Sequence, residues 1–324
     1  MQSPNTWREL LGTIISDPQE ERRLIDLMGI RPITLLRWVQ NKTEPRPYFL
    51  RQLLDALPQY RDSLLPLMEK EFPGVSGLVE DEVPKEIAAS FYTHVLETYV
   101  ATPPSLRFWS ICPLILQHIL EHLDPEQRGL ELLVVRCMPP SGQDQKIHSL
   151  REYVALGTPP WQTDLEERNL FLGAESLAGY AVSSCHTAVI QNLQQDHSFL
   201  PAQQEEHERS AAAFPLMLAS HIAGCLLVSS TQPQYFHRLR VAVLKQYTNL
   251  LVLAFQTEEF YDPASIELHM MPSQRMQQPY FATLRQRVAD VLAQAKARQQ
   301  SLTSQQAEHL ARQQLEQELL QIPL

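Results

Sequence analysis

The sequence contains few cysteines and no long hydrophobic run. Its four scattered cysteines form no Cys-x-x-Cys pair, a pattern typical of chains kept in a reducing cytoplasm; they are Cys112, Cys137, Cys185 and Cys225. The longest apolar stretch, LMLASHIAGCLLV, is interrupted by polar residues and is too short to span a bilayer. The start, MQSPNTWREL, lacks the basic and apolar parts of a secretory signal peptide. We therefore expect a cytoplasmic chain with no membrane partner.

Recognised catalytic signatures are also missing. The sequence has no glycine-rich phosphate loop, no Gly-x-Ser-x-Gly, no His-Glu-x-x-His and no site of paired carboxylates. GAESLAG around Ser176 does not meet the spacing of a nucleophile turn. His118 and His122 have the i, i+4 spacing of two metal ligands, but no third ligand is close to them in the sequence. These absences predict a chain that is not an enzyme and that holds neither a metal ion nor a cofactor.

Positive charge is in the minority. The 27 lysines and arginines stand against 37 acidic residues, so the net charge is −10. That balance argues against general coating of nucleic acid, but it does not exclude one local basic patch. Residues 31–51 carry five cations against the single acid Glu44; the cations are Arg31, Arg37, Lys42, Arg46 and Arg51.

The chain of 324 residues is long enough for two folded domains, and its composition is that of a globular protein, with 44% apolar and 20% charged residues. Residues 5–72 predict a cluster of short helices, one of which begins with Asp17 and Pro18 and ends at Gly29. PGVSGLVEDEVP predicts a linker. We expect four regions: a helical domain (1–72), a linker with a helical spacer (73–103), a second domain (104–262) and a C-terminal helical segment (263–324).

The second domain reads as α+β. Short aliphatic and β-branched segments predict strands: GLELLVVRCM, KIHSLREYVAL, TAVIQNL, SAAAFPLML and HIAGCLLVSS. LAGYAVSS and residues 235–260 predict helices, so we expect a mostly antiparallel sheet flanked by helices. The tail, 280–322, is helical by composition. Its broken apolar stripe fits a dimerising helix and a helix folded back on the domain equally well.

Residues 20–57 resemble the helix-turn-helix region of the lambda-repressor/Cro-like (XRE) family. Gly29 stands at the turn, and NKTEP and YFLRQLLDAL stand where the family has a short loop and a further amphipathic helix. The positions that would form the core are Leu24, Met28, Ile30, Leu35 and Trp38. Three residues depart from the family pattern: Ile25 replaces a small residue, Val39 an acid and Asn41 a glycine, although asparagine tolerates a left-handed backbone.

The resemblance implies that the second helix of this motif enters the major groove of double-stranded DNA. Ile33 or Thr34 would meet a thymine methyl group, and Arg37 would reach a guanine or a phosphate. Asn41, Lys42 and Arg46 would contact backbone phosphates, and Arg31 would lie on the outward face at the start of the helix. The expected DNA-binding residues are Arg31, Ile33, Thr34, Arg37, Asn41, Lys42 and Arg46. The alternative is that these residues form an ordinary solvated helix face.

Residues 104–256 resemble a GAF domain, a module that senses small molecules or dimerises. The resemblance rests on GAESLAGYAVSS, a glycine-led entry into a helix, on DHSF, an Asp-x-x-Phe step after a strand, and on SAAAFPLMLASHIAGCLLV, a pair of strands. It implies a pocket between the sheet and the loops of residues 171–209. The expected ligand contacts, each of which would fit an ordinary core role as well, are Tyr153, Phe171, Tyr180, His186, Phe199 and Phe214.

The ligand itself stays open at this point. The Cys185–His186 pair is of the kind that anchors a linear tetrapyrrole, but it precedes the third strand instead of following the Asp-x-x-Phe step. The Asn-Lys-Phe-Asp-Glu run of cyclic-nucleotide GAF domains is missing. An unidentified small ligand, or dimerisation without a ligand, remains.

The order of these regions predicts a homodimeric, DNA-binding transcriptional regulator that is controlled by a ligand or by dimerisation. The alternative is a protein-interaction scaffold in which the helix-turn-helix has lost DNA binding, as the bulky Ile25 would suggest, and in which the GAF domain only dimerises.

Overall fold

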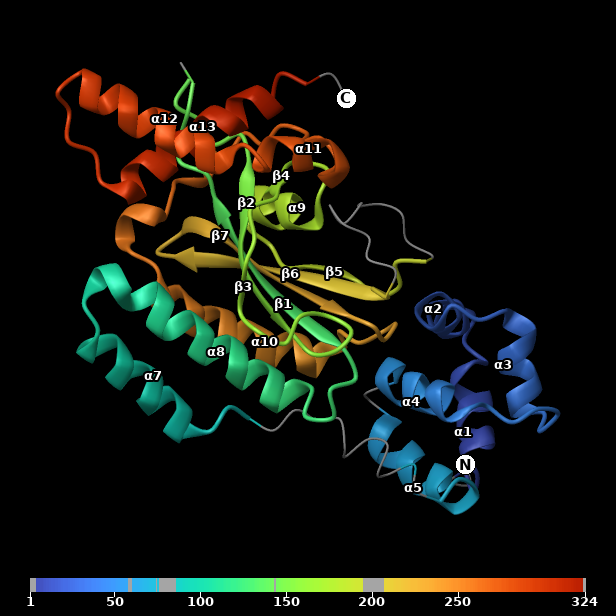
Figure 1. Ribbon diagram of the computed structural model, residues 1–324. Coiled ribbons are helices and arrows are strands. Elements are labelled where there is room, and N and C mark those ends of the chain that lie inside the picture. The colour runs from blue at the N-terminus through green and yellow to red at the C-terminus, as the bar shows by residue number, and fades with distance from the viewer. Residues whose placement is uncertain are drawn as a thin grey trace. The chain divides into compact units, whose positions relative to one another are not determined.

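The computed structural model describes residues 4–57, 60–73, 75, 86–142, 144–194 and 207–322. The chain divides into two compact units, residues 1–83 and 84–324, each with its own hydrophobic core (Figure 1). Among the helices of the described residues, none is both long and apolar enough to cross a membrane.

The first unit consists of short helices: α1 (Trp7–Ile14), α2 (Pro18–Met28), α3 (Pro32–Val39), α4 (Pro47–Ala56) and α5 (Arg61–Glu71). The side chain of Asp17 accepts a hydrogen bond from the amide of Gln19 and so caps α2, and Pro18 occupies the first turn. Gly29 ends α2 in the left-handed conformation, with φ 60° and ψ 30°, which a side chain would disfavour. Fully or almost fully buried side chains of the core include Trp7, Leu11, Leu24, Leu35, Trp38, Leu50, Leu53, Leu54 and Leu57.

The second unit is built on an antiparallel sheet, in which the described strands follow the order β3-β2-β1-β7-β6-β5, with β4 also paired to β2. The strands are β1 (Leu130–Cys137), β2 (Leu150–Gly157), β3 (Glu166–Glu167), β4 (Phe171–Leu172), β5 (Ala188–Ile190), β6 (Ser210–Leu218) and β7 (His221–Ser230). The long central strands carry buried residues on both faces, because helices cover both sides of the sheet.

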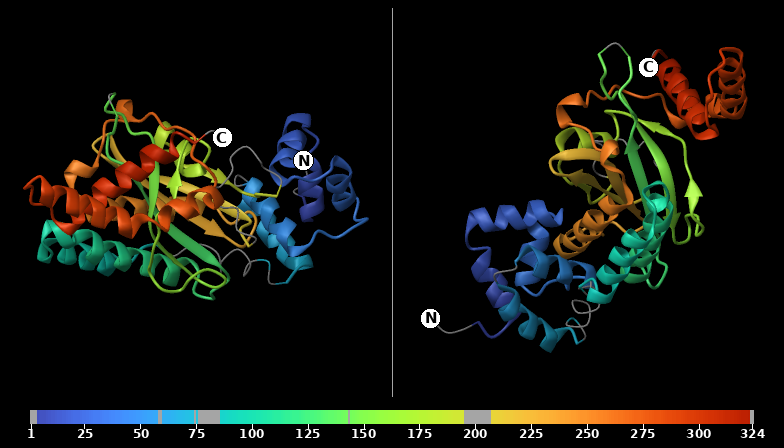
Figure 2. Two further views of the ribbon diagram at one scale, coloured as in Figure 1. Left: turned by 45° about the horizontal axis from the view of Figure 1, so that its top comes forward. Right: turned by 90° about the vertical axis from the view of Figure 1, so that its left-hand side faces the viewer.

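Two layers of helices enclose this sheet (Figures 1 and 2). One face packs on α8 (Arg107–Leu123) and α10 (Arg238–Leu251), with α7 (Ala89–Ala101) against α8. The other face packs on α9 (Leu177–Ser184). Short 3-10 turns complete the connections: η2 (Pro104–Leu106), η3 (Val252–Ala254), η4 (Thr257–Glu259) and η5 (Pro263–Ser265).

A β-bulge interrupts the β1–β2 ladder. Val134 pairs with Val154, but the next residue, Val135, pairs with Glu152, so Tyr153 has no partner in the register. Because one residue is inserted, the alternation of side chains along β2 changes phase at this point. The side chain of Glu152 therefore lies on the sheet face that α9 covers. The side chains of its neighbours, Arg151 and Tyr153, lie on the face that α8 covers.

The C-terminal segment folds back on the rest of the second unit. It contains α11 (Gln274–Phe281), α12 (Leu284–Ala297) and α13 (Ser304–Leu319), and α12 and α13 form a hairpin. Leu315 and Leu319 of α13 are fully buried in a small cluster with Met138 and Phe171. Of the two possibilities for the tail, the structure has the helix folded back on the domain.

The expected spacer also differs in the structure. Phe91 and Val95 of α7 are buried in the same core as α8, and the ring of Phe91 stacks on His118 with centroids 3.6 Å apart. Residues 89–101 are thus a packed helix of the second unit, because their apolar side chains find partners on α8.

Candidate functional site

The first candidate site is the outer surface of α3 and the loop that follows it. Ile33 is 52% exposed, Thr34 is half-buried, and the other predicted DNA-binding residues are exposed: Arg31, Arg37, Asn41, Lys42 and Arg46. The opposite face of α3 buries Leu35 and Trp38 in the core. The helix therefore presents its polar and basic residues outward, as an amphipathic helix does.

Contacts from two other helices fix the C-terminal end of α3. The guanidinium of Arg8, on α1, donates to the carbonyl of Trp38 and forms an ion pair with Glu71 of α5. Trp7 Nε1 donates to the other oxygen of the same carboxylate at 2.6 Å. Because Arg8 is buried, these bonds hold α3 in a defined position relative to α1 and α5.

Ile25 and Asn41, which depart from the helix-turn-helix pattern, both fit the backbone and the packing of the first unit. Ile25 is half-buried at the edge of the core, and its carbonyl accepts hydrogen bonds from the amides of Gly29 and Ile30. Asn41 adopts the left-handed conformation, with φ 55°, which asparagine tolerates better than most residues. The same unit also exposes apolar side chains, among them Leu27 and Leu36.

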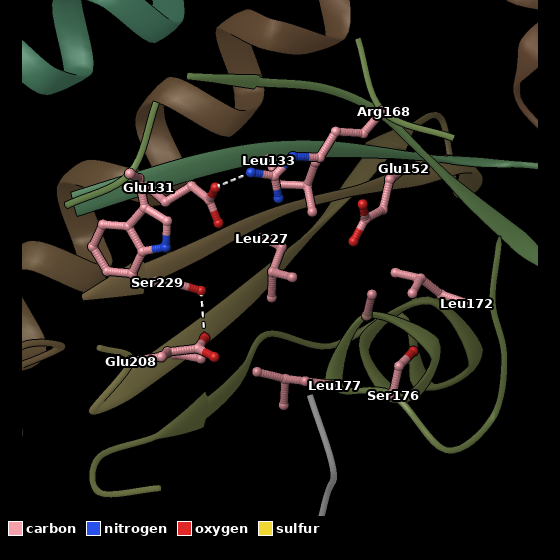
Figure 3. A pocket seen from close by; sticks show the side chains of 13 residues that line it. Glu131, Leu133, Glu152, Arg168, Leu172, Ser176, Leu177, Glu208, Leu227 and Ser229 are labelled. Carbon is pink, nitrogen blue, oxygen red and sulfur yellow. Dashed lines mark hydrogen bonds and ion pairs between the residues drawn. The ribbon is translucent and has the colours of Figure 1, made fainter. Parts of the chain in front are cut away.

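The second candidate site is a cavity of about 30 Å³ between the sheet and α9 (Figure 3). This is room for one or two water molecules. Its polar lining comes from three glutamates, Glu131, Glu152 and Glu208, with Arg168, Ser176 and Ser229. The remaining lining residues are Leu133, Trp161, Leu172, Leu177, Ala178, Ala211 and Leu227.

Arg168 is the cation of this cavity. Its Nη2 donates to Glu131 at 2.6 Å and its Nε to Glu166 at 3.2 Å. Burial acts to lower the pKa of Arg168, but the carboxylates of Glu131, Glu152 and Glu166 outweigh that effect and raise it above its usual value. The guanidinium therefore stays charged among these acids.

The two serines have structural partners. Ser229 Oγ donates to Glu208 at 2.5 Å, as drawn in Figure 3. Ser176 caps α9: its Oγ accepts from the amide of Gly179 at 2.9 Å and donates to the carbonyl of Gly173 at 2.8 Å. The GAESLAG stretch is therefore a helix N-cap, which explains why a serine stands there.

A larger cleft of about 530 Å³ adjoins the cavity. Glu152, Trp161 and Arg168 line both spaces, so these three side chains stand between the cavity and the cleft. The cleft also carries Glu166, His207, Gln274 and Gln278, of which the last two belong to α11.

The ligand contacts predicted from the sequence lie elsewhere. Tyr153 and Phe214 pack on the α8 face of the sheet, and Phe171 is buried under α13. Tyr180 and His186 are exposed on and after α9. Phe199 lies outside the described residues. None of the five described side chains lines the cavity, because strand alternation and the tail direct them to other surfaces.

The charged residues that line the cavity were not among the site residues predicted from the sequence. Glu131 and Glu152 stand within otherwise apolar predicted strands, GLELLVV and SLREYVAL, and both are buried. A charged residue in a strand of this kind requires a polar partner inside the fold. That was the available signal for a polar cavity in the second unit.

The two histidines with metal-ligand spacing have another partner. His118 Nδ1 lies 2.6 Å and His122 Nδ1 2.7 Å from the hydroxyl of Tyr247 on α10. Both imidazoles thus link α8 to α10. Across the described part of the chain, no three histidine, cysteine or acidic side chains are placed to share a metal ion.

Comparison with known proteins identifies the second unit. Residues 113–256 match the family model described as GAF domain. This segment is a GAF domain. No curated protein matches the chain. The GAF domain comprises the described sheet with α9, α10 and most of α8, and it suggests a sensory or regulatory role for the chain.

Several solved structures resemble the chain at low sequence identity. One is the GAF domain from an Acinetobacter phosphoenolpyruvate-protein phosphotransferase, with 15% identity, 52% of this chain and 93% of that chain covered, and a TM-score of 0.37. Another is a putative GAF sensor protein from Burkholderia vietnamiensis, with 16% identity, 52% and 94% covered, and a TM-score of 0.33.

The missing motifs predicted that the chain is not an enzyme, and this prediction was wrong. The similar structures include a type II free methionine-R-sulfoxide reductase from Thermoplasma acidophilum, with 13% identity, 49% of this chain and 98% of that chain covered, and a TM-score of 0.35.

Proposed function

We propose that the chain is a homodimeric, DNA-binding transcriptional regulator in which the GAF domain senses a small molecule. The observation that carries this proposal is the exposed basic surface of α3 and its following loop. Four cations and one acid stand there at exposed positions: Arg31, Arg37, Lys42, Arg46 and Glu44. The surface is positive within a chain whose net charge is −10.

The shape of the first unit supports a groove-binding role. The major groove admits one α-helix, and α3 is short, amphipathic and exposed along one side. The bonds of Arg8 to Trp38 and Glu71 hold this helix before any partner arrives, so little order has to be gained on binding. Ile33 offers an apolar contact for a thymine methyl group, and the guanidinium of Arg37 offers several hydrogen-bond donors to a guanine or a phosphate.

The cavity under α9 supports a sensory role for the GAF domain. Its polar lining holds three carboxylates against the single guanidinium of Arg168. A ligand that displaces water there must offer polar groups to this lining. We therefore favour a small polar molecule, which would enter from the adjoining cleft past Trp161.

The test is DNA binding by the full-length chain as a function of salt. We expect enrichment of a paired short motif from genomic fragments. Three to five phosphate contacts per head give a log–log slope of about −3 to −5 per head. Arg37→Ala should weaken specific binding by roughly 10- to 100-fold, since one good base contact contributes about 1–3 kcal/mol. Lys70→Ala, which removes an exposed cation of α5 outside the proposed surface, is the matched control.

The scaffold alternative is favoured by one observation, the exposed apolar side chains of the same unit, Leu27, Ile33 and Leu36. A folded protein that shows no salt-sensitive affinity for any DNA would support the scaffold and reject the regulator. Equal losses for Arg37→Ala and Lys70→Ala would argue that the attraction is diffuse and that α3 does not read DNA.

A further inference from the structure

Three arginine side chains meet outside the cavity under α9, beside the start of β2. Arg136 and Arg151 are direct partners across the β1–β2 ladder, and both guanidiniums lie over the ring of Tyr153, at 4.5 and 4.6 Å from its centroid. The third, Arg312, comes from α13 of the C-terminal hairpin. Like charges placed directly opposite each other on a sheet destabilise it. This arrangement therefore needs a compensating interaction.

One neutral atom joins two of these arginines. Asn169 Oδ1 accepts a hydrogen bond from Arg151 Nη1 and another from Arg312 Nη2, each at 3.1 Å. The strand and the hairpin thus direct two guanidiniums at the same point. An amide oxygen carries only a partial negative charge, so it satisfies the donors without balancing the positive charge.

The nearby acids balance the other two arginines. Arg136 forms an ion pair with Glu259, and Arg312 forms one with Glu308 at 2.6 Å. Arg151 is only 9% exposed, and the hydrogen-bond acceptor described for it is the Asn169 amide. One buried guanidinium is therefore left with weaker, more distant compensation, which includes an attraction to Glu308.

The electrostatics agree with an excess of positive charge. Burial, and then the charges of Arg312 and Arg136, lower the pKa of Arg151 below its usual value. Burial and the same group of arginines also lower the pKa of His309, which lies one turn from Arg312 on α13. Protonation is thus disfavoured on both elements that border the cluster.

We propose that Arg151 and Arg312 bind a small oxyanion of the phosphate class between β2 and α13. Guanidiniums match phosphate oxygens with pairs of donors, and a partly buried position strengthens those bonds. The anion would supply the charge that Asn169 lacks. Since Arg312 belongs to the hairpin, binding would also stabilise the docked state of α13. This proposal uses no part of the DNA-binding surface.

The experiment is calorimetric titration of the full-length protein with inorganic phosphate, at an ionic strength held constant with chloride. We expect saturable binding that falls at least tenfold in Arg151→Gln and in Arg312→Gln. Arg285→Gln removes an exposed cation from α12 of the same hairpin and should leave the affinity unchanged within twofold. A phosphomonoester titrated in parallel distinguishes free phosphate from an organic phosphate as the preferred ligand.

A stability measurement separates a binding role from a structural one. Without phosphate, Arg151→Gln should unfold at the same temperature as the unmodified chain or at a higher one, because it removes a poorly compensated buried charge. Phosphate should slow hydrogen exchange of α13 in the unmodified protein and not in Arg312→Gln. Absence of binding, or a phosphate effect that both variants retain, would overturn the proposal, since the latter is the general effect of an excluded salt.

Discussion

At the level of single residues, the position of α3 depends on Arg8 and Glu71. Arg8 is buried, and its charge is balanced by one carboxylate that also accepts from Trp7. Burial would raise the pKa of Glu71, but the hydrogen bonds from Arg8 and Trp7 together lower it below its ordinary value. The folded state therefore stabilises ionised Glu71 more than the unfolded chain does.

The first prediction concerns Glu71→Gln. Loss of a hydrogen-bonded charge next to a buried guanidinium should destabilise the first unit by about 1–2 kcal/mol at neutral pH, less than a fully buried pair because Glu71 is partly exposed. In the unmodified chain, this contribution is present above the unfolded pKa and is lost as the pH falls through the lowered folded pKa. Hydrogen exchange of residues 4–73 under increasing urea, at neutral and acidic pH, measures both effects.

Glu20→Gln is the matched control for this prediction. Glu20 pairs with Arg23 at the surface of α2, where such pairs contribute about 0.5 kcal/mol. If Glu71→Gln destabilised the unit no more than Glu20→Gln, the tie between α1, α3 and α5 would not hold α3 in place.

How far single residues could be predicted differs between the two units. The exposed positions of α3 follow from the helical period, which is local and visible in the sequence. The cavity residues do not, because the unpaired Tyr153 shifts the phase of β2 and moves Glu152 to the α9 side. A bulge depends on the partner strand, so alternation within β2 alone could not reveal it.

At the level of elements, the docking of α13 depends on a buried acid. Glu316 is fully buried, and its Oε1 accepts from Ser149 Oγ at 2.5 Å. Burial raises the pKa of Glu316 to about 7, although Ser149 and the nearby His148 act to lower it. The docked helix thus favours the protonated acid.

The second prediction follows from the sign of that shift. A raised folded pKa gives stability that is complete below the unfolded pKa, about 4.5, and that is lost as the pH rises through about 7. Above that value, Glu316→Gln should stabilise docked α13 by roughly 1–3 kcal/mol and remove its pH dependence. Hydrogen exchange of α13 at pH 6 and pH 8, corrected for intrinsic rates, measures the difference.

Glu318→Gln is a control of opposite sign on the same helix. Arg287 donates to both oxygens of Glu318, at 2.6 and 2.8 Å, and this interaction lowers the pKa of the acid. Its removal should weaken the α12–α13 hairpin at neutral pH. Equal exchange rates in Glu316→Gln and the unmodified chain at pH 8 would contradict the account of α13 docking.

Elements were predictable where their signals are local. The strands GLELLVVRCM, SAAAFPLML and HIAGCLLVSS and the helix LAGYAVSS correspond to β1, β6, β7 and α9. The direction of the tail was not predictable, because the contacts that decide it, such as Glu316 with Ser149, join residues far apart in sequence. A broken apolar stripe predicts which face of a helix is buried, but it does not predict which element packs against that face.

At the level of the whole molecule, the proposed regulator requires two chains to read a paired site. The second unit leaves apolar side chains uncovered on α7, where Val100 is 81% and Leu96 51% exposed. These residues lie one turn apart and so share a helix face. Leu106 and Trp109, at the start of the next helix, are also exposed. We propose a second copy of the chain as the partner of this surface.

The third prediction joins this surface to DNA binding. Val100→Glu should convert the dimer to a monomer, since an exposed charge at the centre of an apolar contact must be desolvated. Affinity for a paired operator should then fall by about 100-fold, because the second head no longer benefits from effective concentration, while binding to one half-site persists. Leu218→Glu changes an exposed leucine at the end of β6; it is the control and should remain dimeric.

Light scattering of the full-length proteins gives the mass, and titration of operators with one and two half-sites gives the affinities. An unmodified chain that is monomeric with and without DNA would reject the coupling, whereas dimers that survive Val100→Glu would place the interface on another surface.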